Sequence, residues 1–172
     1  MKLYHISDNE FIKEFETRKA NQAWPNLNKE YVWAISSEMV HNYYFPRNCP
    51  RVCWMIGPNT NINDKDYISS LGDYRGVIFT EKSWEEEIHK TKMYRYRFDT
   101  SSFYPVDYDA GYYVSERVET PINLEIISNL LDELRESRIK VVFVDDLAEY
   151  QKQSIERSFR FSNIRMNYKN KK

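Results

Sequence analysis

The sequence contains little glycine and almost no cysteine. Only 4 of its 172 residues are glycine, and it has neither a P-loop nor a G-x-G-x-x-G pattern, so a backbone cradle for phosphate is not indicated. The 2 cysteines, Cys49 and Cys53, have only His41 nearby, which leaves too few ligands for a zinc site. We interpret both cysteines as buried structural residues and expect neither a disulfide framework nor a metal.

A charge excess of one sign and long apolar runs are also lacking. The sequence has 25 basic and 26 acidic residues, a formal net charge of −1, so no overall basic field draws it to nucleic acid. No apolar run is long enough to span a bilayer, and the first residues show no signal-peptide pattern. We therefore expect a cytoplasmic protein without a membrane partner.

Aromatic residues, in contrast, are abundant. They make up 16% of the chain, with 14 tyrosines, and hydrophobic residues make up 41%. This composition is sufficient for one hydrophobic core, so we expect a single domain over 1–172 whose basic residues 169–172 are frayed.

The hydrophobic periodicity predicts an α+β fold with mixed or antiparallel sheets and flanking helices. Loops are expected over 17–28 and 101–110, and a short helix or turn over 10–15. Helices are expected over 39–44, 64–71, 81–90, 124–137 and 147–159. Ser36 or Ser37 is expected to cap the first helix, and Gly72 to end the second. Thr80, Asn123, and Asp145 or Asp146 are expected to cap the third, fourth and fifth helices. Strands are expected over 2–7, 31–35, 52–56, 77–79, 92–99, 111–121 and 140–144.

The stretch 32–45 joins an aromatic strand to a short helix. Trp33 lies in the expected strand, and Tyr43 and Tyr44 end the expected helix. Such rings can form a wall for a flat ligand, or they can be ordinary core residues. The two prolines of the following turn hold Arg47 and Arg51 on a stiff segment, which suits either contact with a phosphate or carboxylate, or surface ion pairs.

The order of several of these residues is similar to that of a known enzyme class. The sequence has His5 in a Leu-Tyr-His strand, then Trp33 and Tyr44 eleven residues apart, then a late strand with a glutamate. This order resembles the histidine–tyrosine–glutamate class of ADP-ribosyltransferases. The resemblance implies an ADP-ribosyltransferase-like split β core and NAD as the substrate.

The resemblance also implies roles for individual residues. His5 would bond the adenosine-side ribose of NAD. Tyr44, or Tyr43, would stack on the nicotinamide ring, with Trp33 as the other wall.

The late glutamate would be the catalytic residue. Glu119, or Glu116, would bond a hydroxyl of the nicotinamide ribose and stabilise an oxocarbenium-like transition state. A water-shielded pocket would favour transfer over hydrolysis.

Most of the sequence also resembles a family of small bacterial proteins described only as a domain of unknown function. Relatives often read Ser-Arg-Glu-Thr after the Gly-Tyr strand, whereas 115–119 reads Ser-Glu-Arg-Val-Glu here, so Glu116 and Glu119 both stay candidates. If a nucleotide binds, this resemblance adds Arg47, Arg51 and Arg165 as pyrophosphate contacts, with salt bridges as the alternative. The matching segments are 3–7, 32–35, 45–51, 94–96, 111–115 and 161–165.

Three hypotheses follow from these residues. The first is an NAD-dependent ADP-ribosyltransferase-like enzyme acting on an unspecified macromolecule. The second is a module of the same fold that binds a nucleotide without transferring it. The third is a metal-free hydrolase that uses His5 with a carboxylate, although no nucleophile motif accompanies the histidine.

Overall fold

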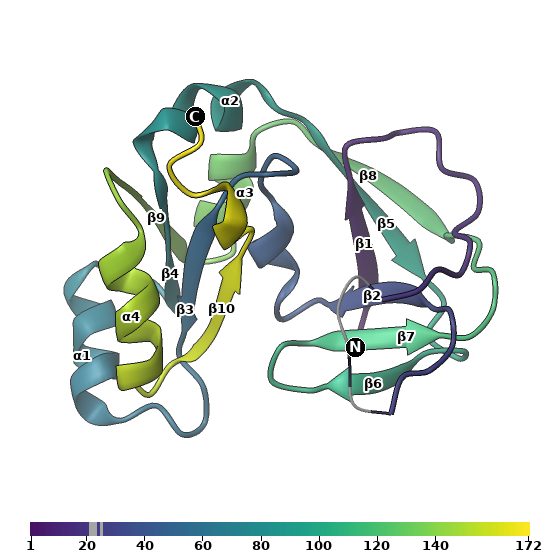
Figure 1. The fold of residues 1–172 in the computed structure, drawn as a ribbon, viewed down its shortest axis with the longest axis horizontal. Coiled ribbons are helices and arrows are strands. Elements are labelled where there is room, and N and C mark those ends of the chain that lie inside the picture. The colour runs from purple at the N-terminus through teal and green to yellow at the C-terminus, as the bar shows by residue number, and fades with distance from the viewer. Residues whose placement is uncertain (21–23, 25) are drawn as a thin grey trace. The chain divides into compact units, whose positions relative to one another are not determined.

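The computed structural model of the chain describes residues 1–20, 24 and 26–172. Over these residues the chain forms two mostly antiparallel β-sheets and four α-helices, which confirms the expected α+β class (Figure 1). None of the described helices is long and apolar enough to cross a membrane. The chain divides into two compact units: unit 1 comprises Met1–Val40 and Met93–Ile127, and unit 2 comprises His41–Lys92 and Ser128–Lys172. The expectation of one domain over 1–172 stays a prediction.

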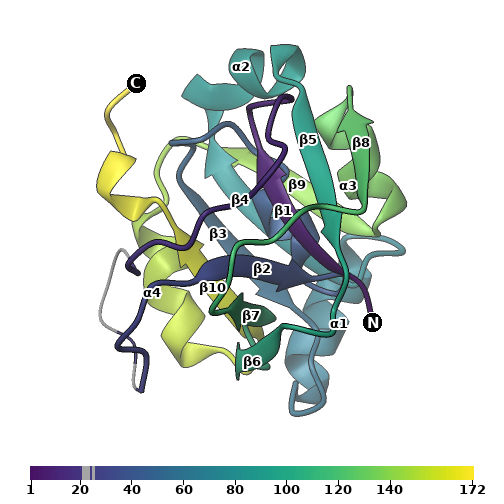
Figure 2. The same ribbon diagram turned by 90° about the vertical axis from the view of Figure 1, so that its right-hand side faces the viewer.

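Unit 1 is built on a six-stranded sheet in the order β6-β7-β2-β1-β5-β8, in which every neighbouring pair is antiparallel (Figure 2). The expected strands over 2–7, 31–35 and 92–99 are confirmed. The six strands are β1 (Leu3–Ser7), β2 (Val32–Ser36), β5 (Met93–Phe98), β6 (Tyr104–Asp107), β7 (Tyr112–Ser115) and β8 (Asn123–Ile127).

The two faces of this sheet follow from the alternation of side chains along each strand. On one face, called the His5 face, the ring of Phe15 contacts those of His5 in β1 and of Tyr96 and Phe98 in β5. The opposite face, called the Trp33 face, carries Tyr4, Trp33 and Tyr112, as the registers Tyr4↔Ile35 and Ile35↔Tyr112 require. The buried hydrophobic strand residues of the His5 face are Leu3, Val32, Ala34, Tyr96, Phe98 and Tyr113.

The expectations for the two edge strands of this sheet were wrong. The loop expected over 101–110 contains β6, whose Pro105 is tolerated because β6 is an edge strand. Asn123 does not cap a helix over 124–137 but begins β8, which pairs with β5. The helix starts only at Leu130, and Asn129 caps it by accepting from Asp132 N at 3.1 Å. A short apolar run fits a strand and a helix equally well, and pairing with β5 decided between them.

The segments around the two ends of the sheet also differ from expectation. The strand expected to continue over 116–121 ends at Ser115, and the segment 10–15 is not helical. Instead, Phe15 and Glu119 form an isolated antiparallel bridge. The helix expected over 39–44 is a 3₁₀ helix over Val40–Tyr43. Of the loop expected over 17–28, residues 21–23 and 25 lie outside the described residues.

Unit 2 is built on a four-stranded sheet in the order β10-β3-β4-β9, with one parallel pair, β4 and β9. Short 3₁₀ helices follow β4 at Lys82–Trp84 and β10 at Met166–Tyr168. The strands are β3 (Arg51–Met55), β4 (Gly76–Glu81), β9 (Ile139–Val144) and β10 (Arg160–Ile164), and the helices are α1 (Ile62–Ser70), α2 (Glu85–Lys90), α3 (Leu130–Glu136) and α4 (Ala148–Glu156).

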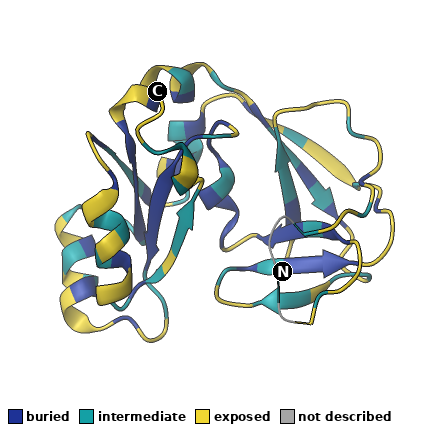
Figure 3. Ribbon diagram, viewed as in Figure 1, coloured by how far each residue is buried: buried dark blue, intermediate teal, exposed yellow. Residues whose placement is uncertain are grey.

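The core of unit 2 surrounds Trp54 of β3, which is fully buried. Its ring stacks on Phe159 with centroids 5.5 Å apart, and its Nε1 donates to Ser154 Oγ of α4 at 2.8 Å. Figure 3 shows β3 and β4 as mostly buried and α1 and α4 with exposed outer sides. The other buried members are Val52, Ile68, Val77, Phe79, Val144 and Leu147.

The helix ends of unit 2 test the cap predictions. Gly72 follows the α1 C-cap with a φ of 121°, which confirms its expected place after that helix. The N-cap of α4 is Leu147 and not the expected Asp145 or Asp146, although Asp146 Oδ1 accepts from Ala148 N at 3.0 Å. Thr80, however, lies within β4, and α2 begins four residues later than the expected Glu81. In the basic tail over 169–172, which was expected to be frayed, Asn170 N donates to Glu81 Oε1 at 3.0 Å.

Candidate functional site

A cluster of polar side chains in unit 1 surrounds the carboxylate of Glu119. This residue is only 8% exposed. Its Oε1 accepts from Ser102 Oγ and from Ser115 Oγ, both at 2.5 Å, and Arg117 Nε lies 3.4 Å away. Among the residues that the structure describes, every hydrogen bond to this carboxylate ends on Oε1. Oε2 therefore has no hydrogen-bond partner among these residues.

The backbone fixes the side of the sheet on which Glu119 lies. Phe15 N donates to Glu119 O at 2.8 Å, and Glu119 N donates to Phe15 O at 3.1 Å. Directly opposed residues of an antiparallel pair direct their side chains to the same side. Phe15 packs on the His5 face, so Glu119 is held on that face as well.

His5 borders the same phenylalanine. Its ring centroid is 4.8 Å from that of Phe15, and its Nδ1 is 3.2 Å from Trp33 O. Because a carbonyl oxygen only accepts, Nδ1 carries the hydrogen and Nε2 keeps its lone pair. Burial lowers the pKa of His5 to about 4, with a smaller effect from Arg18, so the imidazole is neutral at pH 7.

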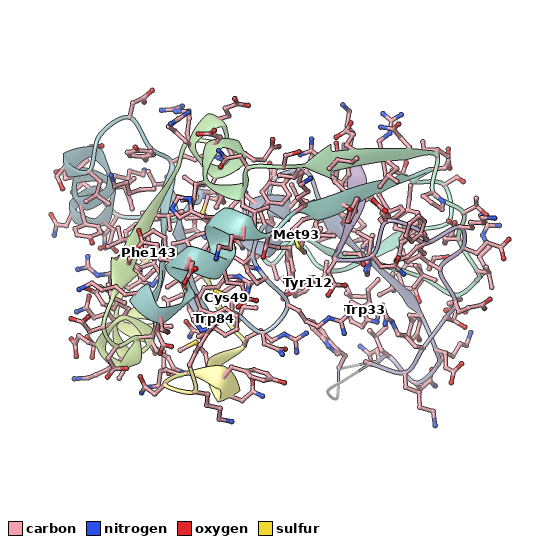
Figure 4. All side chains as sticks on the ribbon, turned by 90° about the horizontal axis from the view of Figure 1, so that it is seen from above. Trp33, Cys49, Trp84, Met93, Tyr112 and Phe143 are labelled. Carbon is pink, nitrogen blue, oxygen red and sulfur yellow. The ribbon has the colours of Figure 1, made fainter. Side chains whose placement is uncertain are left out.

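Trp33 does not share this face. Its side chain lies on the Trp33 face, where its ring centroid is 5.3 Å from that of Trp24 and 6.1 Å from that of Tyr112 (Figure 4). The structure therefore brings His5 and Glu119 to one face and places the Trp33 ring on the other.

Glu116, the second candidate glutamate, takes part in a surface network. Its carboxylate accepts from Lys29 Nζ at 2.6 Å and from Tyr104 OH at 2.9 Å. The hydrogen bond from Lys29 holds the pKa of Glu116 below its usual value. Both oxygens of this exposed carboxylate already have hydrogen-bond partners. In Glu119, by contrast, the hydrogen bonds from described residues all end on Oε1.

Arg51, in unit 2, binds the backbone of the proline-rich turn. Its side chain is buried, with Nε donating to Asn42 O at 2.6 Å and Nη1 donating to Cys49 O at 2.7 Å. The guanidinium also lies over the rings of Tyr43 and Phe45, 5.0 Å from the centroid of the latter. These contacts hold the Arg51 side chain between Asn42 and Cys49.

The other predicted residues of unit 2 have different environments. Tyr44 is 1% exposed and Tyr43 is half-buried, whereas Arg47 and Arg165 are exposed. Arg165 precedes the last 3₁₀ helix with a φ of 57°. Their expected contacts with a nucleotide, and that of Arg51, stay predictions.

Both cysteines belong to unit 2 and are free and buried, as expected. Burial raises the pKa of Cys49 to about 11 and that of Cys53 to about 12. Both are therefore thiols at neutral pH, and a reactive thiolate is not available.

Sequence reasoning missed Ser102, Ser115 and Phe15. One signal was present: by alternation with Tyr113, Ser115 falls on the buried face of β7. Nothing in the sequence links residue 15 or 102 to Glu119, because those contacts are made between segments distant in the chain.

A buried histidine in unit 2 was also missed. His41 is 1% exposed, accepts on Nδ1 from Arg75 Nη2 at 3.1 Å, and directs Nε2 to Met55 Sδ at 3.3 Å. Burial, and then Arg75 and Arg160, lower its pKa to about 3. His41, like His5, is therefore neutral in the folded protein at pH 7.

Acidification should consequently destabilise the protein. Since the folded-state pKa of His41 lies below its unfolded value of 6.5, the unfolded chain binds more protons between these values. The stabilising contribution is complete above pH 6.5 and is lost as the pH falls toward 3. Between pH 7 and 5 we expect a loss of about 2 kcal/mol in the free energy of unfolding from His41, and a further loss of the same sign from His5.

Urea unfolding of the wild type and of His41→Gln at pH 7, 6 and 5 measures this contribution. The variant should show the weaker pH dependence, while a matched change at the exposed His89, His89→Gln, should leave the wild-type dependence intact. Parallel pH profiles for wild type and His41→Gln would contradict the prediction.

The geometry defines an α+β protein whose antiparallel sheet holds a buried, hydroxyl-bound carboxylate and a neutral histidine on one face. The chain belongs to the family of unknown function DUF6886, whose model matches residues 4–169. This match confirms the expected uncharacterised family. No curated protein and no solved structure matches the chain. The family carries no assigned activity, so the resemblance to ADP-ribosyltransferases stays a prediction.

Proposed function

We propose that this chain is an ADP-ribosyltransferase-like enzyme that cleaves the nicotinamide glycosidic bond of NAD, with Glu119 as its catalytic carboxylate. One observation carries the proposal. The Glu119 carboxylate is buried, fixed through Oε1 by two serine hydroxyls, and held on the same sheet face as His5.

The proposed chemistry needs a fixed negative charge. The bond between the ribose C1′ and the nicotinamide nitrogen breaks, and its electron pair leaves with nicotinamide, whose ring becomes neutral. The ribose becomes an oxocarbenium ion, which a nearby carboxylate stabilises. An acceptor nucleophile then attacks C1′ and loses a proton. Glu119 Oε2 would accept from a hydroxyl of this ribose and face the developing charge.

His5 suits the recognition of a second sugar hydroxyl. In the neutral form, with Nδ1 donating to Trp33 O, its Nε2 can accept from a ribose hydroxyl. The bond to Trp33 O also fixes the plane of the ring. The Trp33 side chain would not contact a ligand on the His5 face, because it lies on the opposite face of the sheet.

Calorimetry with NAD, together with chromatographic measurement of nicotinamide release, tests the proposal. We expect wild type to bind NAD and release nicotinamide. His5→Ala should weaken binding by about 10-fold, the value of one or two hydrogen bonds, while the matched surface variant His89→Ala should bind as wild type does. Binding without release would instead support the nucleotide-binding module, and the absence of both would refute both hypotheses.

A further inference from the structure

The two serines on Glu119 come from different parts of unit 1. Ser115 is the last residue of β7 and is fully buried. Ser102 is half-buried in the turn between β5 and β6. Each hydroxyl has one hydrogen to donate, and a carboxylate oxygen has two lone pairs, so both serines can donate to Oε1 at the same time.

This arrangement has a consequence for the second oxygen. With Oε1 held from two directions, rotation about the last side-chain bond of Glu119 would break two hydrogen bonds to a charged group. Arg117 Nε, at 3.4 Å, is a weaker third contact on a largely exposed side chain. These hydrogen bonds fix the plane of the carboxylate, so the position of Oε2 is fixed as well.

We infer that Ser102 and Ser115 are positioning residues that hold the Glu119 carboxylate with Oε2 directed to the ligand. This inference rests on the proposed function only in the identity of the ligand. The orientation of the carboxylate is a property of the free protein, and it can be measured without turnover. Ser115 at the end of β7 and Ser102 from another segment together fix the Glu119 carboxylate, which would otherwise rotate about its last side-chain bond.

The variants Ser102→Ala and Ser115→Ala remove one hydroxyl each. Ser102→Thr keeps the hydroxyl at the half-buried site, and Ser101→Ala removes a neighbouring exposed serine that has no contact with Glu119 among the described residues. These four variants, the wild type and Glu119→Gln are labelled with ¹³C at the glutamate carboxylates, and the Glu119 signal is assigned by its loss in Glu119→Gln. In the alanine variants this signal should shift, while in Ser102→Thr and Ser101→Ala it should stay at the wild-type position.

Nicotinamide release is measured on the same proteins. Mispositioning of a catalytic group costs on the order of 10- to 100-fold, and we expect that loss in kcat for both alanine variants, with KM for NAD within about twofold of wild type. Ser102→Thr should restore kcat. An unchanged Glu119 signal in both alanine variants would overturn the inference whatever the activity, as would unchanged kcat in an active enzyme. A shifted signal in a protein that releases no nicotinamide would support the positioning role and refute the proposed function.

Discussion

Changing Glu119 to glutamine should lower kcat for nicotinamide release by about 100- to 1,000-fold, the usual cost of removing one electrostatic contact to a transition state. The glutamine has nearly the same shape and still offers an oxygen to Ser102 and Ser115. It lacks the negative charge that would stabilise the oxocarbenium ion. Affinity for NAD should therefore change little, because the charge acts on the transition state more than on the bound substrate.

Glu116→Gln is the matched control for this prediction. Glu116 is three residues away, is exposed, and is already bonded to Lys29 and Tyr104. Its replacement should leave kcat within about twofold of wild type, since exposed ion pairs contribute little. Equal losses in the two variants, or a larger loss in Glu116→Gln, would show that Glu119 is not the catalytic carboxylate.

Changing Trp54 to alanine should lower the free energy of unfolding by roughly 3–5 kcal/mol, as expected for a large buried aromatic residue. The Trp54 side chain fills the space between the sheet of unit 2 and α4, and its ring also lies 4.9 Å from that of Phe79. The variant loses these contacts and leaves Ser154 Oγ without its indole donor. Because domains of this size are commonly stable by only about 5–15 kcal/mol, part of the protein should be unfolded at 37 °C.

Urea unfolding followed by circular dichroism measures the loss. Phe161→Ala is the control, because Phe161 lies opposite Trp54 in the register of β10 and β3 but is 44% exposed. It should cost less than half as much. If Trp54→Ala were as stable as Phe161→Ala, the core of unit 2 would not be centred on Trp54.

The sequence alone predicted the elements with strong local signals. Alternation along 92–99 identified β5, and the run of β-branched residues over 140–144 identified β9. Gly72 marked the end of α1 because a positive φ after a helix favours glycine. The two edge strands of unit 1 gave weaker signals: β6 contains Pro105, and β8 reads equally well as the beginning of a helix. Their pairing with β7 and β5 is a long-range contact that no local pattern encodes.

For the candidate site, the sequence determined the chemical groups: a histidine on the first strand and two glutamates in the strand expected over 111–121. Only the tertiary structure showed that the two glutamates have different environments. Glu119 is buried because the backbone of Phe15, from the N-terminal part of the chain, forms a β-bridge with it. Ser102, in the turn before β6, also donates a hydrogen bond to its carboxylate. Glu116, three residues earlier, is exposed and bonded to Lys29. The environment of a side chain depends on which distant segments pack against it, and the sequence of 115–119 does not contain that information.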